Sequence, residues 1–188
     1  MSKAIGVIAE DRSDVAVVSV LLEKYAPKDK FVIRSFVGNG CGKLRSKCQV
    51  WADNLVQRGC EHVFLFHDLD RHTETDLRAG LVEKMKAKPR VKSLVVIPVE
   101  EIEAWLLSDE EALRCVFSLK QKPKKYKNCE TVSSPKQELE RLVWQSAKKR
   151  YLNTVHNVRI AERTSLDNLR RCPSFIPFDA YIKKNIFR

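Results

Sequence analysis

Short apolar runs alternate with amphipathic stretches through the first part of the chain. Four runs have the length and the β-branched or aromatic content of buried strands. They cover residues 4–10, 31–37, 63–66 and 91–99. Helical patterns lie between them, over residues 15–25, from the turn at Gly38 to about Arg58 and from about Thr73 to Lys88, and another begins at Ala104. This alternation predicts an α/β fold, in which helices cover both faces of a mainly parallel four-stranded sheet.

The pattern changes after Leu119, where runs of strand length give way to helical stretches. Helices are predicted from Pro135 to about Trp144, over residues 156–162 and 165–171, and at the end of the chain as far as Phe187. We therefore expect an α/β core over residues 1–119 and a helical extension over residues 120–188 that packs on this core.

Two local signals follow the first two predicted strands. Ser13 is the predicted N-cap of the first helix. Residues 38–43, Gly-Asn-Gly-Cys-Gly-Lys, form a glycine-rich turn. This turn is not a P-loop, because Val37 and Leu44 stand where that motif needs Gly and Ser or Thr. We expect it to reverse the chain and to bring backbone N–H groups near a phosphate.

Composition places the chain among globular proteins. Its 188 residues are 44% hydrophobic and 31% charged, and no apolar run approaches the ~20 residues of a membrane span. The N-terminus leads directly into a strand, without the pattern of a signal peptide. The six cysteines contain no C-x-x-C pair, which disfavours a disulfide framework or a zinc site. We expect a cytoplasmic protein with no membrane partner, and an oligomer is left open.

The net charge of +11 is concentrated in the C-terminal third. Residues 1–119 hold 18 Lys or Arg and 18 Asp or Glu, whereas residues 120–188 hold 17 and 6. A neutral body beside a basic segment favours binding of a polyanion, either DNA or RNA. The candidate nucleic-acid-binding residues are Lys122, Lys124, Lys125, Lys127, Lys148, Lys149 and Arg150.

Acidic residues follow three of the predicted strands: Glu10 the first, Asp68 and Asp70 the third, and Glu101 and Glu103 the fourth. The carboxyl ends of parallel strands lie at one edge of a sheet, so these acids can converge. Converging carboxylates repel one another unless a cation neutralises them, and hard divalent cations prefer oxygen ligands. The sequence therefore predicts a Mg²⁺ or Mn²⁺ site. The alternative is an Asp-rich turn with a helix cap at Thr73.

Two ions ~4 Å apart would suit phosphodiester cleavage. Asp14, one turn beyond Glu10, is a candidate ligand of a second ion, although the helix dipole explains a first-turn acid equally well. Lys148 and Lys149 are candidates to stabilise charge on a scissile phosphate or to contact the backbone. The candidate metal ligands are Glu10, Asp14, Asp68, Asp70, Glu101 and Glu103, and the candidate catalytic residues are Glu10, Asp68, Asp70, Lys148 and Lys149. We expect His67 to point into the flank of the sheet and Trp105 to lie in the core.

Glu10 followed later by Asp68-Leu69-Asp70 resembles the Toprim pattern of a Glu after one strand and D-x-D after a later one. Residues 97–107, Ile-Pro-Val-Glu-Glu-Ile-Glu-Ala-Trp-Leu-Leu, and residues 171–175, Arg-Cys-Pro-Ser-Phe, resemble stand-alone bacterial Toprim-like proteins of the DUF4276 family. The resemblance implies a Toprim fold and OLD-like, Mg²⁺-dependent hydrolysis of nucleic acid. It also implies a role in defence against phage beside an ABC-type ATPase partner.

The chain departs from the Toprim pattern at Asp11, where a glycine usually follows the Glu, and it holds no ATPase segment. Other functions use related motifs. A haloacid-dehalogenase-like phosphatase has D-x-D, but after its first strand, and a sugar-nucleotide transferase has D-x-D with a sugar site that nothing here indicates. A Toprim-like module that binds nucleic acid or a protein partner without cutting is the non-catalytic alternative.

Overall fold

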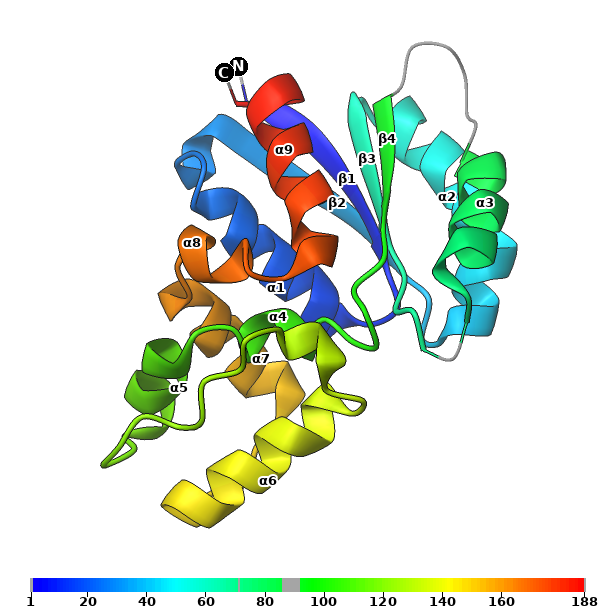
Figure 1. The fold of residues 1–188 in the computed structure, drawn as a ribbon. Coiled ribbons are helices and arrows are strands. Elements are labelled where there is room, and N and C mark those ends of the chain that lie inside the picture. The colour runs from blue at the N-terminus through cyan, green and yellow to red at the C-terminus, as the bar shows by residue number, and fades with distance from the viewer. Residues whose placement is uncertain (1, 71, 86–91, 188) are drawn as a thin grey trace.

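The computed structural model describes residues 2–70, 72–85 and 92–187. Within them lies a four-stranded sheet whose strands all run parallel, in the order β2-β1-β3-β4 (Figure 1). The strands are β1 (Lys3–Ala9), β2 (Phe31–Val37), β3 (His62–Phe66) and β4 (Lys92–Val96). The predicted α/β fold with a parallel sheet is confirmed.

Helices cover both faces of this sheet (Figure 1). On one face lie α2 (Cys41–Gln57) and α3 (Glu74–Met85), over a cluster that includes Ile8, Leu65 and Val95. On the other lie α1 (Arg12–Glu23) and the C-terminal helix α9 (Ile176–Asn185), over the alternate residues, such as Val7 and Phe64. Because successive side chains of a strand point to opposite faces, a strand buried on both faces is apolar throughout.

The segment after residue 119 packs against the first part of the chain. Its aromatic side chains Phe175 and Phe178 contact Phe66 and Trp105, so Trp105 lies in the core as predicted. The remaining helical elements are η1 (Lys28–Lys30), α4 (Glu103–Leu106), α5 (Glu110–Phe117), η2 (Cys129–Thr131), α6 (Pro135–Ala147), α7 (Asn153–Arg163), α8 (Leu166–Leu169) and η3 (Pro173–Phe175). Helix α7 packs along α1, which brings its Asn157 beside Ser13 and Glu103 at the carboxyl edge of the sheet.

Some element ends differ from the prediction. The N-cap of α1 is Asp11, not Ser13, because the Asp11 side chain accepts hydrogen bonds from the N–H groups of Ser13 and Asp14. Strand β4 ends at Val96 rather than at residue 99, just before Pro98, which has no N–H to donate. The predicted start of that strand at Val91 and the end of the preceding helix at residues 86–88 lie outside the described residues.

Candidate functional site

The carboxyl ends of β1 and β3 bring Glu10 and Asp68 together. Each residue lies shortly after its strand, and the backbone N–H of Asp68 donates a hydrogen bond of 3.2 Å to Glu10 Oε1. Burial raises the pKa of Glu10, the hydrogen bond from Asp68 lowers it, and the nearby Asp70 raises it further. The predicted convergence of these strand ends is therefore present.

Asp14, in the first turn of α1, is the next member of the group. Its Oδ2 accepts the backbone N–H of Asp11 at 3.1 Å, in a reciprocal arrangement that fixes both side chains. Only 8% of Asp14 is exposed. Burial first, and then the negative charge of Asp11, raise its pKa to about 8. Asp11 thus has a defined structural role, as the helix cap that holds Asp14.

Glu103 enters from α4 and is held by residues that the sequence did not single out. Asn157 of α7 donates from Nδ2 to Glu103 Oε1 at 3.0 Å and to Ser13 Oγ at 2.9 Å. The hydroxyl of Tyr151 donates to Asn157 Oδ1. Burial raises the pKa of Glu103, and the Asn157 hydrogen bond lowers it. A signal for Asn157 exists, since it precedes Ile160 and Ala161 by three and four residues on the buried face of α7.

Asp68 lies where these groups meet. Burial raises its pKa well above the usual range, and the charges of Asp14, Glu10, Glu103 and Asp70 raise it further. Charges shift one another's pKa values strongly where the environment is poorly hydrated and screening is weak. Five of the six predicted metal ligands are therefore coupled electrostatically at the carboxyl edge of the sheet. We call Glu10, Asp14, Asp68, Asp70 and Glu103 the carboxylate cluster.

The sixth predicted ligand, Glu101, lies beside this cluster. Its charge raises the pKa of Glu103, and its Oε2 accepts the backbone N–H of Lys136 at 2.9 Å, so it also anchors the start of α6. The loops that carry these acids are strained, because Asp70 and Glu100 have φ angles of 48° and 61° in the left-handed region. Such strain at non-glycine residues is common where a loop is shaped for binding or catalysis.

The donor chemistry of the carboxylate cluster fits a hard divalent cation. Within residues 2–70, 72–85 and 92–187, no Lys or Arg forms an ion pair with Asp14, Asp68 or Glu103, although burying such charges is costly without compensation. Carboxylate oxygens are the ligands that Mg²⁺ and Mn²⁺ prefer. In the same residues, however, no three or more His, Cys, Asp and Glu side chains are arranged as a group ready to hold a metal ion. The carboxylate cluster therefore suits a divalent cation through the type and charge of its oxygen donors, and not through a preformed arrangement of them.

A family model described as a domain of unknown function (DUF4276) matches residues 9–182. The chain belongs to the DUF4276 family. The expected membership of this family is confirmed, and the matched span contains the whole carboxylate cluster. Neither the curated proteins nor the solved structures contain a match to the chain.

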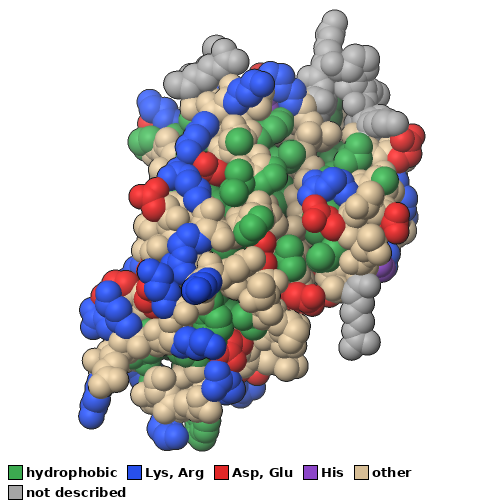
Figure 2. Space-filling model, in the orientation of Figure 1, with side chains coloured by type: hydrophobic (Ala, Val, Ile, Leu, Met, Phe, Trp, Pro, Cys, Tyr) green, Lys and Arg blue, Asp and Glu red, His purple; other side chains and the backbone are tan. Residues whose placement is uncertain are grey.

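The predicted basic residues of this DUF4276 chain lie apart from the carboxylate cluster. Lys149 Nζ donates to the backbone oxygen of Phe117 at 3.2 Å, and Lys148 Nζ lies 5.8 Å from the centre of the Trp144 ring. The loop lysines Lys122 and Lys125 form ion pairs with acids of α5. Lys124 lies over the Tyr126 ring, and Lys127 is exposed. Figure 2 shows Lys and Arg side chains gathered over α5, α6 and the loop between them.

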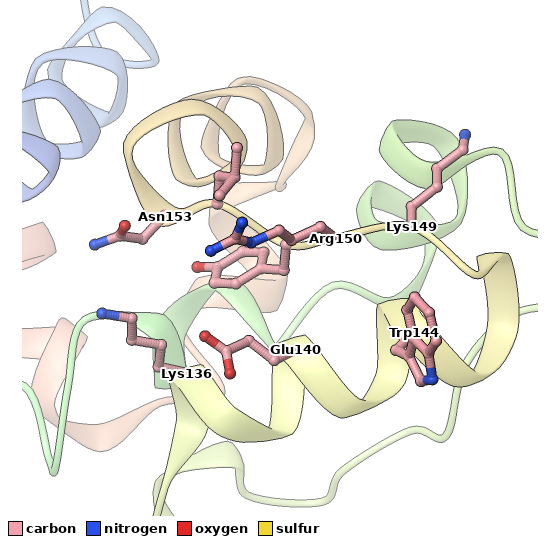
Figure 3. A pocket seen from close by; sticks show the side chains of 8 residues that line it. Lys136, Glu140, Trp144, Lys149, Arg150 and Asn153 are labelled. Atoms are coloured by element: carbon pink, nitrogen blue, oxygen red, sulfur yellow. The ribbon is translucent and has the colours of Figure 1, made fainter.

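A pocket of about 510 Å³ opens between α6 and the start of α7 (Figure 3). Arg150 extends over it toward Asn153, Lys136 lines its end with the amine directed away from Glu140, and Lys149 points away. A second pocket of about 300 Å³ is lined by Asp70 and Glu101 and shares Lys136 and Glu140 with the first. A basic pocket and the acids at the sheet edge are therefore neighbours through α6.

His67 and the glycine-rich turn lie next to Glu10, at the end of β1. His67 is fully buried, and its Nδ1 lies 2.6 Å from the backbone oxygen of Asp68 and 3.4 Å from Glu10 Oε1. In the turn, the N–H groups of Gly38 and Asn39 donate to the backbone oxygens of Ala9 and Glu10. These two N–H groups are therefore occupied, and the turn's contribution is to hold the end of β1 rather than to offer them to a phosphate.

No helix of the described residues is long and apolar enough to cross a membrane.

Proposed function

We propose that the protein is a divalent-metal-dependent nuclease that hydrolyses phosphodiester bonds of DNA or RNA. The observation that carries the proposal is the meeting of carboxylates from three strand ends, whose pKa values are raised, while no Lys or Arg of the described residues forms an ion pair with Asp14, Asp68 or Glu103. Such a group is stable at neutral pH when a cation compensates its charge.

The cations that suit these oxygens are Mg²⁺ or Mn²⁺, and two ions are expected. Glu10, Asp68 and Asp70 would hold them, with Asp14 and Glu103 deeper in the cluster and Glu101 beside it. Bound divalent ions polarise phosphoryl oxygens and lower the pKa of water. Asn157 orients Glu103, and Asp11 orients Asp14. Lys136 and Arg150 are the nearest basic side chains of the neighbouring pocket, and we assign them the binding of the phosphate backbone. We assign Lys148 and Lys149 only contacts with the backbone of the nucleic acid, and no stabilisation of charge on the scissile phosphate.

The Toprim-like motifs motivate two further parts of the proposal. They favour an OLD-like nuclease that acts in defence against phage, and they favour an ATPase encoded nearby as the partner that triggers it. The chain has no nucleotide-hydrolysing segment of its own, so a trigger by ATP requires that partner. Both parts rest on the motifs Glu10 and Asp68-Leu69-Asp70.

One observation favours a second candidate function. Because the described residues contain no group of side chains prearranged to hold a metal ion, a module that binds nucleic acid or a protein without cutting is the alternative. A metal-dependent phosphatase or phosphotransferase would use the same carboxylates on a small substrate and would leave polynucleotides intact.

Cleavage of supercoiled plasmid, linear DNA and total tRNA, with Mg²⁺, Mn²⁺ or EDTA, tests the proposal. The variant Asp68→Asn keeps the size of the side chain and removes its charge. Asp29→Asn is the matched control, because Asp29 is exposed and precedes β2 at the opposite edge of the sheet. We expect metal-dependent cleavage by the native chain and by Asp29→Asn, and none by Asp68→Asn. Equal cleavage by Asp68→Asn, or no cleavage with and without the ATPase, would contradict a nuclease.

A further inference from the structure

We propose that the pocket between α6 and α7 binds single-stranded nucleic acid, with one base stacked on Trp144. The strand would then pass Arg150 and Lys136 toward the carboxylate cluster. The position of the cut in this scheme rests on the proposed nuclease function, whereas the binding itself does not.

The exposure of Trp144 is the first observation. Helix α6 buries Leu139, Leu142 and Val143, and it turns Trp144 outward with 58% of the residue exposed. The other two tryptophans are used inside the fold: Trp105 is fully buried, and Trp51 stacks on Phe36 at 5.5 Å between ring centres. A large, flat and exposed aromatic ring is costly to hydrate and suits stacking with a partner.

The charges around Trp144 favour a polyanion as that partner. Lys148 Nζ lies 5.8 Å from the ring centre, and exposed Arg150 follows two residues later in the chain. The pocket beside the ring, about 510 Å³, is of a size that holds a nucleotide. In Figure 3 the Arg150 guanidinium extends over this pocket toward Asn153, and Lys136 lines the end of the pocket, so both can reach phosphate oxygens of a bound strand.

The pocket also leads to the proposed site of cleavage. Lys136 and Glu140 line both this pocket and the smaller one formed with Asp70 and Glu101. In addition, Tyr151 at the floor of the pocket is buried and donates to Asn157, which binds Glu103. A strand stacked on Trp144 would therefore pass along α6 toward Asp70, at the edge of the carboxylate cluster.

A single strand fits this surface better than a duplex or a protein. Paired bases in a duplex present their edges and not their faces, so stacking on an aromatic side chain needs an unpaired base. Protein partners instead place apolar anchors in apolar pockets. Here five of the eight lining side chains are charged or carry an amide, and the apolar members beside Trp144 are Tyr151 and Leu152.

Binding of the full chain to labelled single-stranded DNA and RNA, in EDTA to prevent cleavage, tests the inference. Fluorescence anisotropy gives the affinity, with the duplex of the same length as comparison. We expect Trp144→Ala and Trp144→Leu to weaken single-strand binding about ten-fold or more, and Trp144→Phe to retain most of it. Arg150→Gln should weaken binding and reduce its salt dependence by about one ion. Val50→Ala is the control, because Val50 is 62% exposed on α2.

Three results would overturn the inference: no single-strand binding by the native chain, unchanged binding by Trp144→Ala, or equal losses for single strands and duplexes. Retention of binding by Trp144→Leu would also overturn it, since an apolar protein-docking residue tolerates leucine and a stacking platform does not. Failure of the nuclease proposal is distinguishable. In that case the native chain cuts nothing with metal, while Trp144-dependent binding in EDTA persists.

Discussion

Two buried acidic regions of this protein behave in opposite ways. Asp179 on α9 and Asp14 on α1 are 6% and 8% exposed, although Asp14 lies deeper in the protein. Burial raises the pKa of both, yet hydrogen bonds from Arg170, Lys183 and Tyr25 bring that of Asp179 down to about 2. Burial and neighbouring acids bring that of Asp14 to about 8.

The two acids differ in how the chain compensates their negative charge. Asp179 has its compensation built into the chain, with Tyr25 Oη at 2.6 Å, Lys183 Nζ at 2.7 Å and Arg170 Nε at 3.1 Å. The carboxylate cluster receives hydrogen bonds from Asn157 and from backbone N–H groups, but no Lys or Arg of the described residues pairs with Asp14, Asp68 or Glu103. Its missing positive charge is what we assign to divalent cations.

The largest effect is expected for catalysis by Asp68→Asn. Removal of the charge at the centre of the cluster should reduce metal-dependent cleavage at least ~1000-fold, equivalent to about 4 kcal/mol of transition-state stabilisation. Circular dichroism should show an intact fold. Asp179→Asn, measured on the fraction that is folded, should keep nearly native cleavage, and a comparable loss there would erase the distinction between the two regions.

Asp14→Asn should stabilise the metal-free protein at pH 8. A carboxyl group whose folded pKa is raised binds more protons in the folded state, so its stability contribution is present at acidic pH and is lost as pH rises from about 4 to about 8. The variant avoids this loss and should gain roughly 2 to 5 kcal/mol at pH 8, with little gain at pH 4. Urea unfolding in EDTA measures it. A loss of stability at pH 8 would contradict the cause assigned to the raised pKa.

Asp179→Asn should have the opposite sign. A carboxyl group whose folded pKa is lowered stabilises the protein above its unfolded pKa, and this contribution is lost as pH falls from about 4 to about 2. We expect the variant to lose about 2 to 3 kcal/mol at pH 7, because Arg170 and Lys183 lose their common partner and both are partly hydrated. The same unfolding experiment at pH 7 and pH 3 gives the result, and a pH-independent loss would point to packing alone.

Asn157→Asp should change the stability of the protein less than the substitutions of Asp14 and Asp179 do. It keeps the shape of Asn157 but replaces the donor to Glu103 by another acid. We expect a loss of about 1 to 2 kcal/mol at pH 8 without metal, and a smaller loss at pH 5, where the added carboxyl can share a proton. Saturating Mg²⁺ should recover part of the loss. Thermal unfolding at pH 8 and at pH 5, each with and without Mg²⁺, provides the measurement. An equal loss of stability in all four conditions would count against an electrostatic role for Asn157.

The sequence allowed the positions of the acids to be predicted, because these acids follow the ends of parallel strands. Parallel strands end at one edge, so Glu10, Asp68 and Glu103 could be placed together although they are far apart in the chain. The packing of the C-terminal helices was not predictable in this way. Asn157 reaches Glu103 only because α7 packs along α1, and a polar residue on an apolar helix face was its one signal.

The directions of the basic side chains could not be predicted from the sequence either. Lys148 adopts a left-handed conformation, with φ of 54°, where α6 ends, and the chain then directs Lys149 toward Phe117. Net charge along the sequence located the basic segment but not the direction of any side chain. Trp144 was taken as the end of a helix, and its exposure became visible only once Leu142 and Val143 were seen to face the core.

Calorimetric titration of the metal-free protein at pH 8 with Mn²⁺ and with Mg²⁺ tests most directly whether the carboxylate cluster binds metal. We expect saturable binding by the native chain and by Asp29→Asn, accompanied by release of protons from the cluster, and loss of this binding in Asp68→Asn. Absence of saturable binding, or the same binding in Asp68→Asn as in the native chain, would contradict a metal site at the edge of the sheet.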